Sequence, residues 1–315
     1  MFEEIIDRIK RYDTVIIHRH SRPDGDALGA QIGLRRLIEA NFPEKRVCTV
    51  GDAAGRYAFM DGAVMDEIPD GLYAGACAIV LDTAARDLVS DQRFASASCS
   101  LRIDHHIYCE TFTDVEIVDT SFESCCGMIA LLAQESGLRM TREAATAIYT
   151  GMVTDSGRFR YDSTSPRTML LASYLLGAGI DISQIYRNLY SEDLSSVKRR
   201  AAFLSKITVY EDSPVAYMYN TEEEVKALGM DVFAVSRGMV NVMSDIRGID
   251  IWVNFTEDDG KVLCELRSSK YNINPVAVKF GGGGHKKASG ATVANREQAL
   301  LMLGELKKLT ENNDE

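Results

Sequence analysis

Four of the chain's five histidines fall in two short segments, and aspartates accompany them in both. The first segment holds His20 with Asp24 and Asp26, and the second is the triplet Asp104-His105-His106. Imidazole nitrogens and carboxylate oxygens together form the ligand sets of divalent-metal clusters that activate water. The sequence therefore predicts a metal-dependent hydrolase.

Apolar runs that precede these segments predict the elements that position them. Four such runs of β type lie in the N-terminal half, at residues 14–17, 46–50, 76–81 and 100–103. Helical spacing of apolar residues separates them, first over 27–40. Alternating strands and helices are typical of an α/β fold with a parallel sheet, whose ligands bind at the carboxyl ends of the strands. Both histidine segments occupy such ends.

Two more aspartates stand at the ends of predicted elements. Asp82 follows the run 76–81, and Asp155 follows a predicted helix over 142–153, where an acidic side chain lies against the negative end of the helix. Taken alone, Asp82 is typical of a cap or turn, and Asp26 of a helix cap. Carboxylates that converge on one sheet edge repel one another unless a cation lies among them. The set as a whole therefore favours a metal site.

The C-terminal half carries a motif of another kind, the run Gly282-Gly283-Gly284-His285. Consecutive glycines let a phosphate approach the backbone closely and offer it several N–H donors. Arg267-Ser268, at the end of a predicted strand over 262–266, could add a guanidinium fork for the same anion. The alternatives are a flexible glycine loop and an ordinary surface arginine.

The length of 315 residues favours two domains. We predict a parallel-sheet catalytic domain over 1–193, a connecting helix over 194–206, and a smaller α+β substrate-binding domain over 207–315, with a cleft between the domains. Seven cysteines without any Cys-x-x-Cys spacing argue against a disulfide framework and a thiolate zinc site.

The net charge and the hydropathy of the chain indicate which partners it can bind and in which compartment it is found. The formal net charge of −11 opposes binding of long nucleic acid, which needs many cationic contacts to phosphates. No apolar run approaches the ~20 residues that span a bilayer, and the first ten residues lack the features of a secretory signal. We therefore expect a cytoplasmic protein without a membrane partner.

With these segments in this order, the chain resembles the DHH phosphoesterase superfamily, which is named after the triplet seen here as Asp104-His105-His106. The stretch from His20 to Gly29 looks like the first motif of the superfamily, Asp82 like the second, and residues 154–157 like the fourth. Residues 282–290 look like the phosphate-binding motif of the associated C-terminal DHHA1 domain. The first motif often continues Gly-Ser, whereas alanine follows Gly29 here.

The resemblance implies two divalent metal ions, usually Mn²⁺, with Mg²⁺ or Co²⁺ as alternatives. His20 and Asp24 would bind one ion, and Asp26 and His105 would bind the other. Asp82 would bridge both ions, and Asp155 would complete the cluster.

The resemblance also implies an activity. Asp104 and His106 would be catalytic, with His106 facing the scissile phosphate as an electrophile or proton donor. The two-domain layout is similar to the NrnA-type oligoribonucleases, which also dephosphorylate 3′-phosphoadenosine 5′-phosphate. We therefore predict hydrolysis of very short oligoribonucleotides and of this bisphosphate to mononucleotides, in a chain that could form a homodimer. The alternatives are a manganese-dependent pyrophosphatase or exopolyphosphatase and a non-catalytic nucleotide-binding module.

Overall fold

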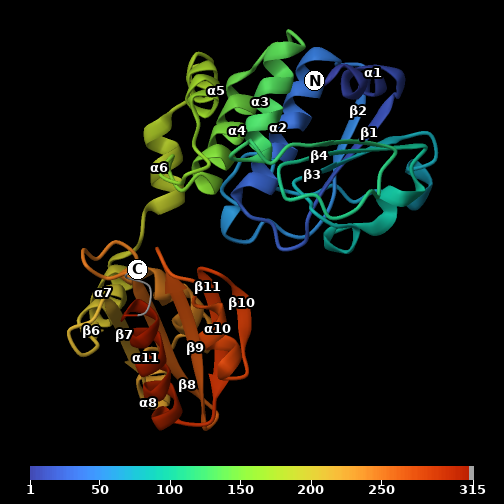
Figure 1. Cartoon of the computed structure of the whole chain (residues 1–315). Helices are drawn as coiled ribbons and strands as arrows, with labels where there is room; N and C mark the ends of the chain where they lie inside the picture. The colour runs from blue at the N-terminus through green and yellow to red at the C-terminus, as the bar shows by residue number, and fades with distance from the viewer. Residues whose placement is uncertain (312–315) are drawn as a thin grey trace. The chain divides into compact units, whose positions relative to one another are not determined.

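A computed structural model describes residues 1–311 of the chain. The chain divides into two compact units, Met1–Ser191 and Glu192–Glu315 (Figure 1). The helix predicted as a connector is α7, Leu194–Leu204, which belongs to the second unit. The domain boundaries given above remain a prediction.

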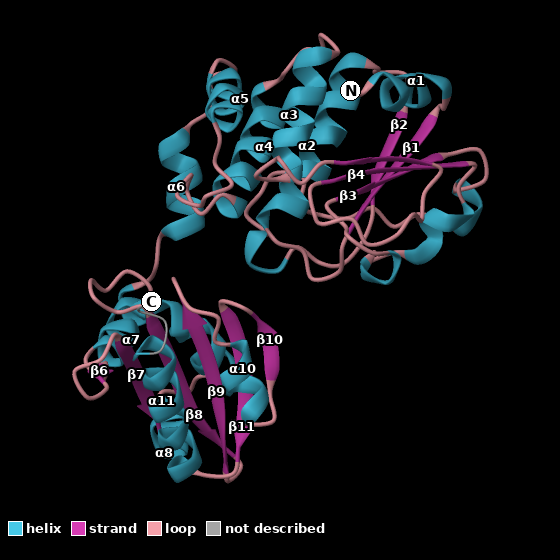
Figure 2. Ribbon diagram, viewed as in Figure 1, coloured by secondary structure: helices cyan, strands magenta, loops and turns pink. Residues whose placement is uncertain are grey.

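The first unit is built on a five-stranded parallel sheet (Figure 2), in agreement with the predicted α/β fold. Its strands are β1 (Thr14–Arg19), β2 (Arg46–Thr49), β3 (Cys77–Leu81), β4 (Cys99–Asp104) and β5 (Val115–Val118). The spatial order is β2-β1-β3-β4-β5, so the direction of winding reverses between β1 and β3. Ligands of open parallel sheets bind at such a reversal. β5, which the sequence analysis did not predict, pairs with β4 at the sheet edge.

Both faces of this sheet are buried. Val15 and Ile17 join the main core, whereas Ile16 between them packs in a second cluster on the other face with Tyr73. The main core is covered by helices α1 (Glu3–Arg11), α2 (Gly25–Asn41), α3 (Cys125–Glu135), α4 (Arg142–Asp155), α5 (Pro166–Leu176) and α6 (Ile182–Tyr190). Short 3-10 segments and loops cover the other face.

The second unit contains a mixed sheet of six strands in the order β10-β11-β9-β8-β7-β6, which agrees with the predicted α+β class. Only β7 and β8 pair in parallel. After α7, its elements are β6 (Thr208–Val209), β7 (Val215–Asn220), α8 (Glu222–Ala227), α9 (Val232–Met239), β8 (Ile251–Asp258), β9 (Lys261–Ser268), α10 (Asn274–Lys279), β10 (Gly283–His285), β11 (Ala288–Val293) and α11 (Arg296–Glu311).

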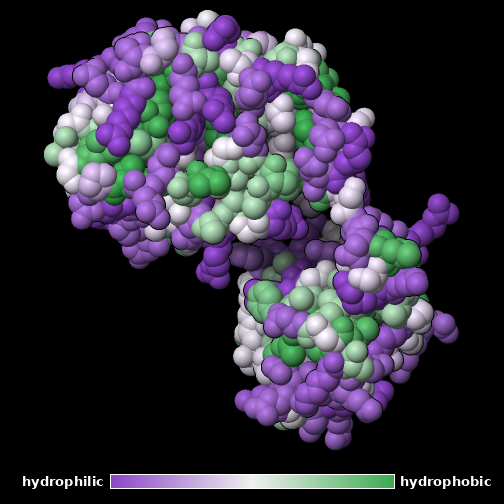
Figure 3. All heavy atoms as spheres, turned by 180° about the vertical axis from the view of Figure 1, so that it is seen from behind, coloured by the Kyte–Doolittle hydropathy of each residue, from purple (hydrophilic) through white to green (hydrophobic). Residues whose placement is uncertain are grey.

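Hydrophilic side chains cover much of the surface seen in Figure 3, with smaller apolar patches among them. None of the described helices combines the length and the apolar character that a membrane span requires.

Candidate metal centre

The carboxyl ends of three neighbouring strands carry four of the residues that the sequence singled out. His20 follows β1, Asp82 follows β3, and Asp104-His105 ends and follows β4. Since β1, β3 and β4 are adjacent and parallel, these ends meet at one edge of the sheet.

Close packing of α2 on α4 brings two more aspartates to the same place. Asp26 lies in the first turn of α2, and Asp155 is the last residue of α4. A Cβ atom built on Gly29 of α2 would lie 2.6 Å from the carbonyl oxygen of Ala147 in α4, so only glycine allows the two helices this approach. The sequence carries a signal for this contact in the four-residue spacing of Gly25, Gly29 and Gly33, which the sequence analysis overlooked.

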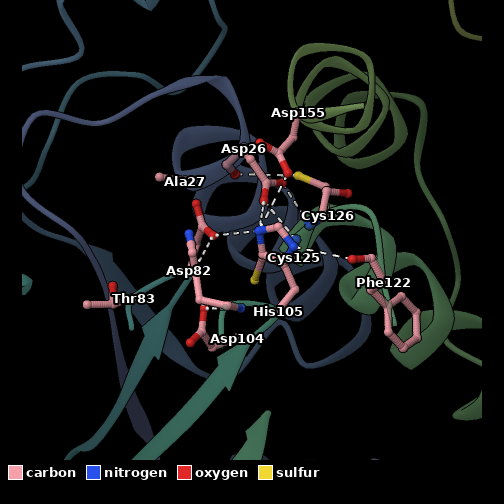
Figure 4. A network of polar contacts seen from close by, with 12 residues as sticks. Asp26, Ala27, Asp82, Thr83, Asp104, His105, Phe122, Cys125, Cys126 and Asp155 are labelled. Carbon is pink, nitrogen blue, oxygen red and sulfur yellow. Dashed lines mark hydrogen bonds and ion pairs between the residues drawn. The ribbon is translucent and has the colours of Figure 1, made fainter. Parts of the chain in front are cut away.

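Asp82 lies at the middle of the group, with its two oxygens facing different histidines. Its Oδ2 is 3.5 Å from Nε2 of His20. Its Oδ1 is 3.4 Å from Nε2 of His105 (Figure 4). The backbone at Asp82 is left-handed, with φ of 51°. This conformation is uncommon for a residue with a side chain and costs on the order of 1 kcal/mol or more, which points to a functional constraint.

The other predicted ligands lie around the same histidines. His105 Nε2 is 3.7 Å from Asp26 Oδ2 and 3.5 Å from Asp155 Oδ2, and His20 Nε2 is 3.8 Å from Asp24 Oδ1. All six side chains predicted as ligands are therefore together. Three overlapping sets have their ligand atoms within 4.8 Å of one another: His20, Asp24 and Asp82; Asp26, His105 and Asp155; Asp82, His105 and His106.

The two aspartates of the first motif have different structural roles. Asp24, rather than Asp26, caps α2, because its Oδ1 accepts hydrogen bonds from the backbone N–H groups of Asp26 and Ala27. The alternative that Asp26 caps this helix is therefore wrong. The buried Asp26 carboxylate instead accepts the N–H groups of Cys125 and Cys126, at 2.7 and 2.9 Å, in the first turn of α3. A helix N-terminus attracts negative charge, so α3 fixes this carboxylate.

The electrostatics of the centre are those of a crowded acidic site. Burial, together with the Asp82 and Asp155 carboxylates, raises the pKa of Asp26 well above its ordinary value. Burial raises the pKa of Asp155 to about 6. Burial alone would lower the pKa of His105, but the nearby Asp82, Asp26 and Asp155 carboxylates raise it to about 10, and Asp24 and Asp82 raise that of His20 likewise to about 10.

One atom tests whether this site suits a cation. Asp82 Oδ1 is buried and accepts no hydrogen bond from any described residue. A buried carboxylate oxygen without a hydrogen-bond donor is costly, and the groups around it are further carboxylates and imidazoles. A divalent cation would satisfy this oxygen and reduce the repulsion between the aspartates. The residues present therefore fit a metal cluster.

A second buried network holds the side chain of His106. Asp104 Oδ1 lies 2.8 Å from His106 Nδ1, and Asp104 Oδ2 accepts a 2.5 Å hydrogen bond from Arg102. Both Arg102 and Asp104 are fully buried. Arg102 also donates to the carbonyl oxygens of Ala84 and Glu110. The sequence analysis missed Arg102, although a charged residue inside the apolar run 100–103 was the available signal.

The predicted phosphate-binding segment lies in the second unit and is not a free loop. Gly283–His285 form β10, which pairs antiparallel with β11. The ladder aligns His285 with Ala288, and Ala288 in turn with Arg267, so His285 and Arg267 lie at the same end of this sheet. His285 is exposed. Gly282 adjoins Gly290, and a Cβ atom at Gly282 would lie 2.0 Å from the Gly290 carbonyl oxygen.

Arg267 and Ser268 are both engaged within the second unit. Arg267 donates to Glu265 at 3.1 Å and to its neighbour's carbonyl oxygen at Leu266. Ser268 is buried, and its hydroxyl donates to the Asp250 carbonyl oxygen while accepting the N–H of Tyr271. Their roles in substrate binding remain predictions.

Comparison with known proteins assigns both units to known domain families. Residues 14–152 match the N-terminal domain of the DHH family, and residues 211–312 match the DHHA1 domain. The chain is 33% identical to the bifunctional oligoribonuclease and PAP phosphatase NrnA of Bacillus subtilis, with both chains covered over 100% of their length. The chain belongs to the DHH family. Its predicted family is thus confirmed.

Two further relatives span nearly the whole chain. The bifunctional oligoribonuclease and PAP phosphatase NrnA of Mycoplasma genitalium is 35% identical over 98% of each chain. The crystal structure of an exopolyphosphatase-related protein from Bacteroides fragilis superimposes with a TM-score of 0.82 at 28% identity, covering 98% of this chain and 95% of that one. As a DHH phosphoesterase, the protein is a metal-dependent hydrolase of phosphate esters, as predicted.

Proposed function

We propose that this DHH phosphoesterase hydrolyses very short oligoribonucleotides and 3′-phosphoadenosine 5′-phosphate to mononucleotides. The full-length relatives from B. subtilis and M. genitalium carry this pair of activities in their names. The observation that carries the proposal is the placement of Asp82, whose two oxygens face His20 and His105 separately among the six side chains predicted as ligands.

Two divalent cations, most suitably Mn²⁺, would be held by this set. His20 and Asp24 would bind one ion and Asp26 and His105 the other, with Asp82 shared between them. Asp155 would complete the cluster. Ligation rich in carboxylate oxygen favours Mn²⁺ or Mg²⁺ over zinc. The ions would polarise the phosphoryl group and lower the pKa of water toward about 7.

The protein's own groups would supply orientation and a proton. Asp104 fixes the His106 ring through Nδ1, so Nε2 is the ring atom left to face the substrate. Arg102 donates a hydrogen bond to the other oxygen of the Asp104 carboxylate and keeps this carboxylate charged. His106 is 45% exposed at its side chain, as a group that must reach a substrate requires. We assign His106 to the scissile phosphate as a hydrogen-bond or proton donor.

The second unit would bind a phosphate that is not cleaved. The glycine run Gly282-Gly283-Gly284 gives the backbone an uncovered surface, while His285 and Arg267 stand at the same end of the sheet. Ser268 would contribute through the turn that it closes. A substrate with two phosphates, such as a bisphosphate or a dinucleotide, suits these two kinds of site.

A product-resolved substrate panel tests the proposal. The full chain, stripped with a chelator and reconstituted with Mn²⁺, is given a 5′-phosphorylated diadenylate, 3′-phosphoadenosine 5′-phosphate, pyrophosphate and polyphosphate. We expect AMP from the first two substrates and no turnover before Mn²⁺ is restored. Parallel reconstitution with Mg²⁺ and Co²⁺ ranks the metals.

The alternative activity is that of a pyrophosphatase or exopolyphosphatase, for which the B. fragilis structure is the supporting observation. It would use the same ions without any contact to a nucleoside. A higher kcat/KM for pyrophosphate or polyphosphate than for both nucleotides would establish this alternative and overturn the proposal.

A further inference from the structure

Seven residues other than glycine have a left-handed backbone in the described chain, and they lie in two parts of it. Three of these seven residues lie in hairpin turns of the second unit, at Glu211, Asp212 and Asp259, where the conformation is expected. Of the remaining four, Arg22 lies in the first motif and Asp82 is the second, whereas Arg158 and Phe159 directly follow the fourth motif at residues 154–157. Strain of this kind persists only where surrounding structure enforces it, and it gathers at functional sites.

Arg22 is held in its strained conformation by a dedicated set of hydrogen bonds. Its φ is 52°, and its backbone N–H donates to Asp52 Oδ2 at 2.8 Å. Asp52 Oδ1 accepts from the Ser90 hydroxyl at 2.8 Å, and the Asp52 N–H donates back to the same hydroxyl. These contacts, with the bond from Arg22, lower the pKa of Asp52 and keep it charged.

Hydrogen bonds from Arg19 also hold the loop that contains Arg22. The fully buried Arg19 donates to the carbonyl oxygens of His20 and Asp52, and its Nε donates to Gln31 at 2.9 Å. Ser90 N–H donates in turn to the Arg19 carbonyl oxygen. Arg19 therefore joins the first motif to the loop around Asp52 and fixes the backbone before Arg22, while the backbone after Arg22 is held by Asp24, which caps α2.

The guanidinium of Arg22, by contrast, is free. It makes no hydrogen bond or ion pair with any residue from 1 to 311, and the side chain is exposed. Arg22 lies two residues from His20 and two from Asp24, so its Cα is at most about 7 Å from the Cα of each. A long cationic side chain thus starts from a fixed point at the rim of the metal centre. Its charge attracts the Asp52 carboxylate, but its guanidinium has no hydrogen-bond or ion-pair partner among residues 1–311.

We propose that Arg22 is a substrate-binding residue whose guanidinium grips non-bridging oxygens of the phosphoryl group that is cleaved. The inference rests on the proposed function and adds a cation to its site. Guanidinium binds phosphate oxygens in a bidentate, charge-assisted way. Because Arg22 adjoins the metal ligands themselves, its contact serves every substrate, whereas the second unit would serve only substrates with a second phosphate.

The test replaces Arg22 without disturbing its backbone. Arg22→Asn keeps the N–H bond to Asp52, and asparagine tolerates left-handed φ, so the melting temperature should not fall. Arg22→Lys keeps only the point charge. Arg46→Gln is the matched control, because Arg46 is exposed at the opposite end of the same sheet, at the start of β2, and loses the same charge.

We expect Arg22→Asn to lower kcat/KM about 10- to 100-fold for diadenylate, bisphosphate and pyrophosphate alike, the range for a lost charge-assisted hydrogen bond. Arg22→Lys should lose less, and Arg46→Gln less than about two-fold. Calorimetric titration of inorganic phosphate into the Mn²⁺-loaded protein should show about 10-fold weaker binding for Arg22→Asn.

Two outcomes would overturn the inference: phosphate binding that Arg22→Asn leaves unchanged, or losses no greater than those of Arg46→Gln. The phosphate titration reports on Arg22 even if the wild-type protein hydrolyses no nucleotide, in which case the proposed function alone fails.

Discussion

The metal centre of the first unit and the glycine-histidine segment of the second unit both carry charged groups for phosphate chemistry, but they are built differently. Asp26, Asp82 and Asp104 are at most 1% exposed. Buried hydrogen-bond donors hold Asp26 and Asp104, and two half-buried histidines flank Asp82. His285 is exposed on a three-residue strand. Buried charges must be mutually compensated, which fixes geometry, whereas an exposed group can adjust to its ligand. The first region therefore suits the reacting atoms and the second suits binding.

The largest expected effect is that of Asp82→Asn in the first region. Loss of the shared carboxylate should reduce kcat/KM by at least about 1,000-fold, since metal assistance contributes several kcal/mol to the transition state. The unfolding transition should be retained. Asp114→Asn, the same change at an exposed carboxylate that bonds Ser100 at the start of β4, is the control. Near-normal activity of Asp82→Asn with saturating Mn²⁺ would remove the bridging role.

Asp104→Asn should separate positioning from metal binding. The His106 ring loses its charged partner, so kcat should fall about 10- to 100-fold while KM changes little. The buried Arg102 then keeps only Glu116, at 3.7 Å, as a carboxylate partner. Removing one member of a buried ion pair costs about 3–5 kcal/mol of stability, which urea unfolding would detect. Equal losses of kcat in Asp104→Asn and Glu116→Gln would contradict the positioning role.

Acid should weaken the first region through His18, which lies fully buried on β1 near Tyr73 and Phe94. Burial lowers the pKa of His18 to about 4 from the ordinary 6.5. Below pH 6.5 the unfolded chain binds a proton that the folded chain does not accept until pH 4, so stability is lost as the pH falls across this interval.

The loss from His18 is on the order of 3 kcal/mol. In the presence of a chelator, His18→Phe should show a smaller decline in unfolding free energy between pH 7 and pH 4.5 than the wild-type protein. Parallel declines in the two proteins would show that His18 does not contribute.

The smallest effect is expected in the second region. His285→Ala should raise KM for 3′-phosphoadenosine 5′-phosphate and for diadenylate about 5- to 10-fold, with kcat and the melting temperature nearly unchanged, because an exposed contact contributes about 1 kcal/mol. Pyrophosphate should be unaffected. If KM for the bisphosphate stays the same, His285 is not part of the binding site.

The motif residues could be predicted from the sequence because their metal-binding chemistry depends on the residue type itself. Aspartate and histidine after apolar runs predicted the sheet edge, and the structure places all six predicted ligands there. The sequence did not predict β10, because four consecutive glycines carry no side-chain pattern that marks a strand. It also assigned no role to Arg22, whose significance lies in a backbone conformation.

The sequence by itself determined the family and the α/β and α+β classes, and it predicted the ligand set, since periodicity and residue type are local properties of the chain. Only the tertiary structure decided that Asp26 is held by the N-terminus of α3, that Arg102 stands behind Asp104, and that the glycine spacing of α2 admits α4. The first and third of these contacts join segments distant in sequence, and the pairing of Arg102 with Asp104 depends on a burial that residue type alone does not encode.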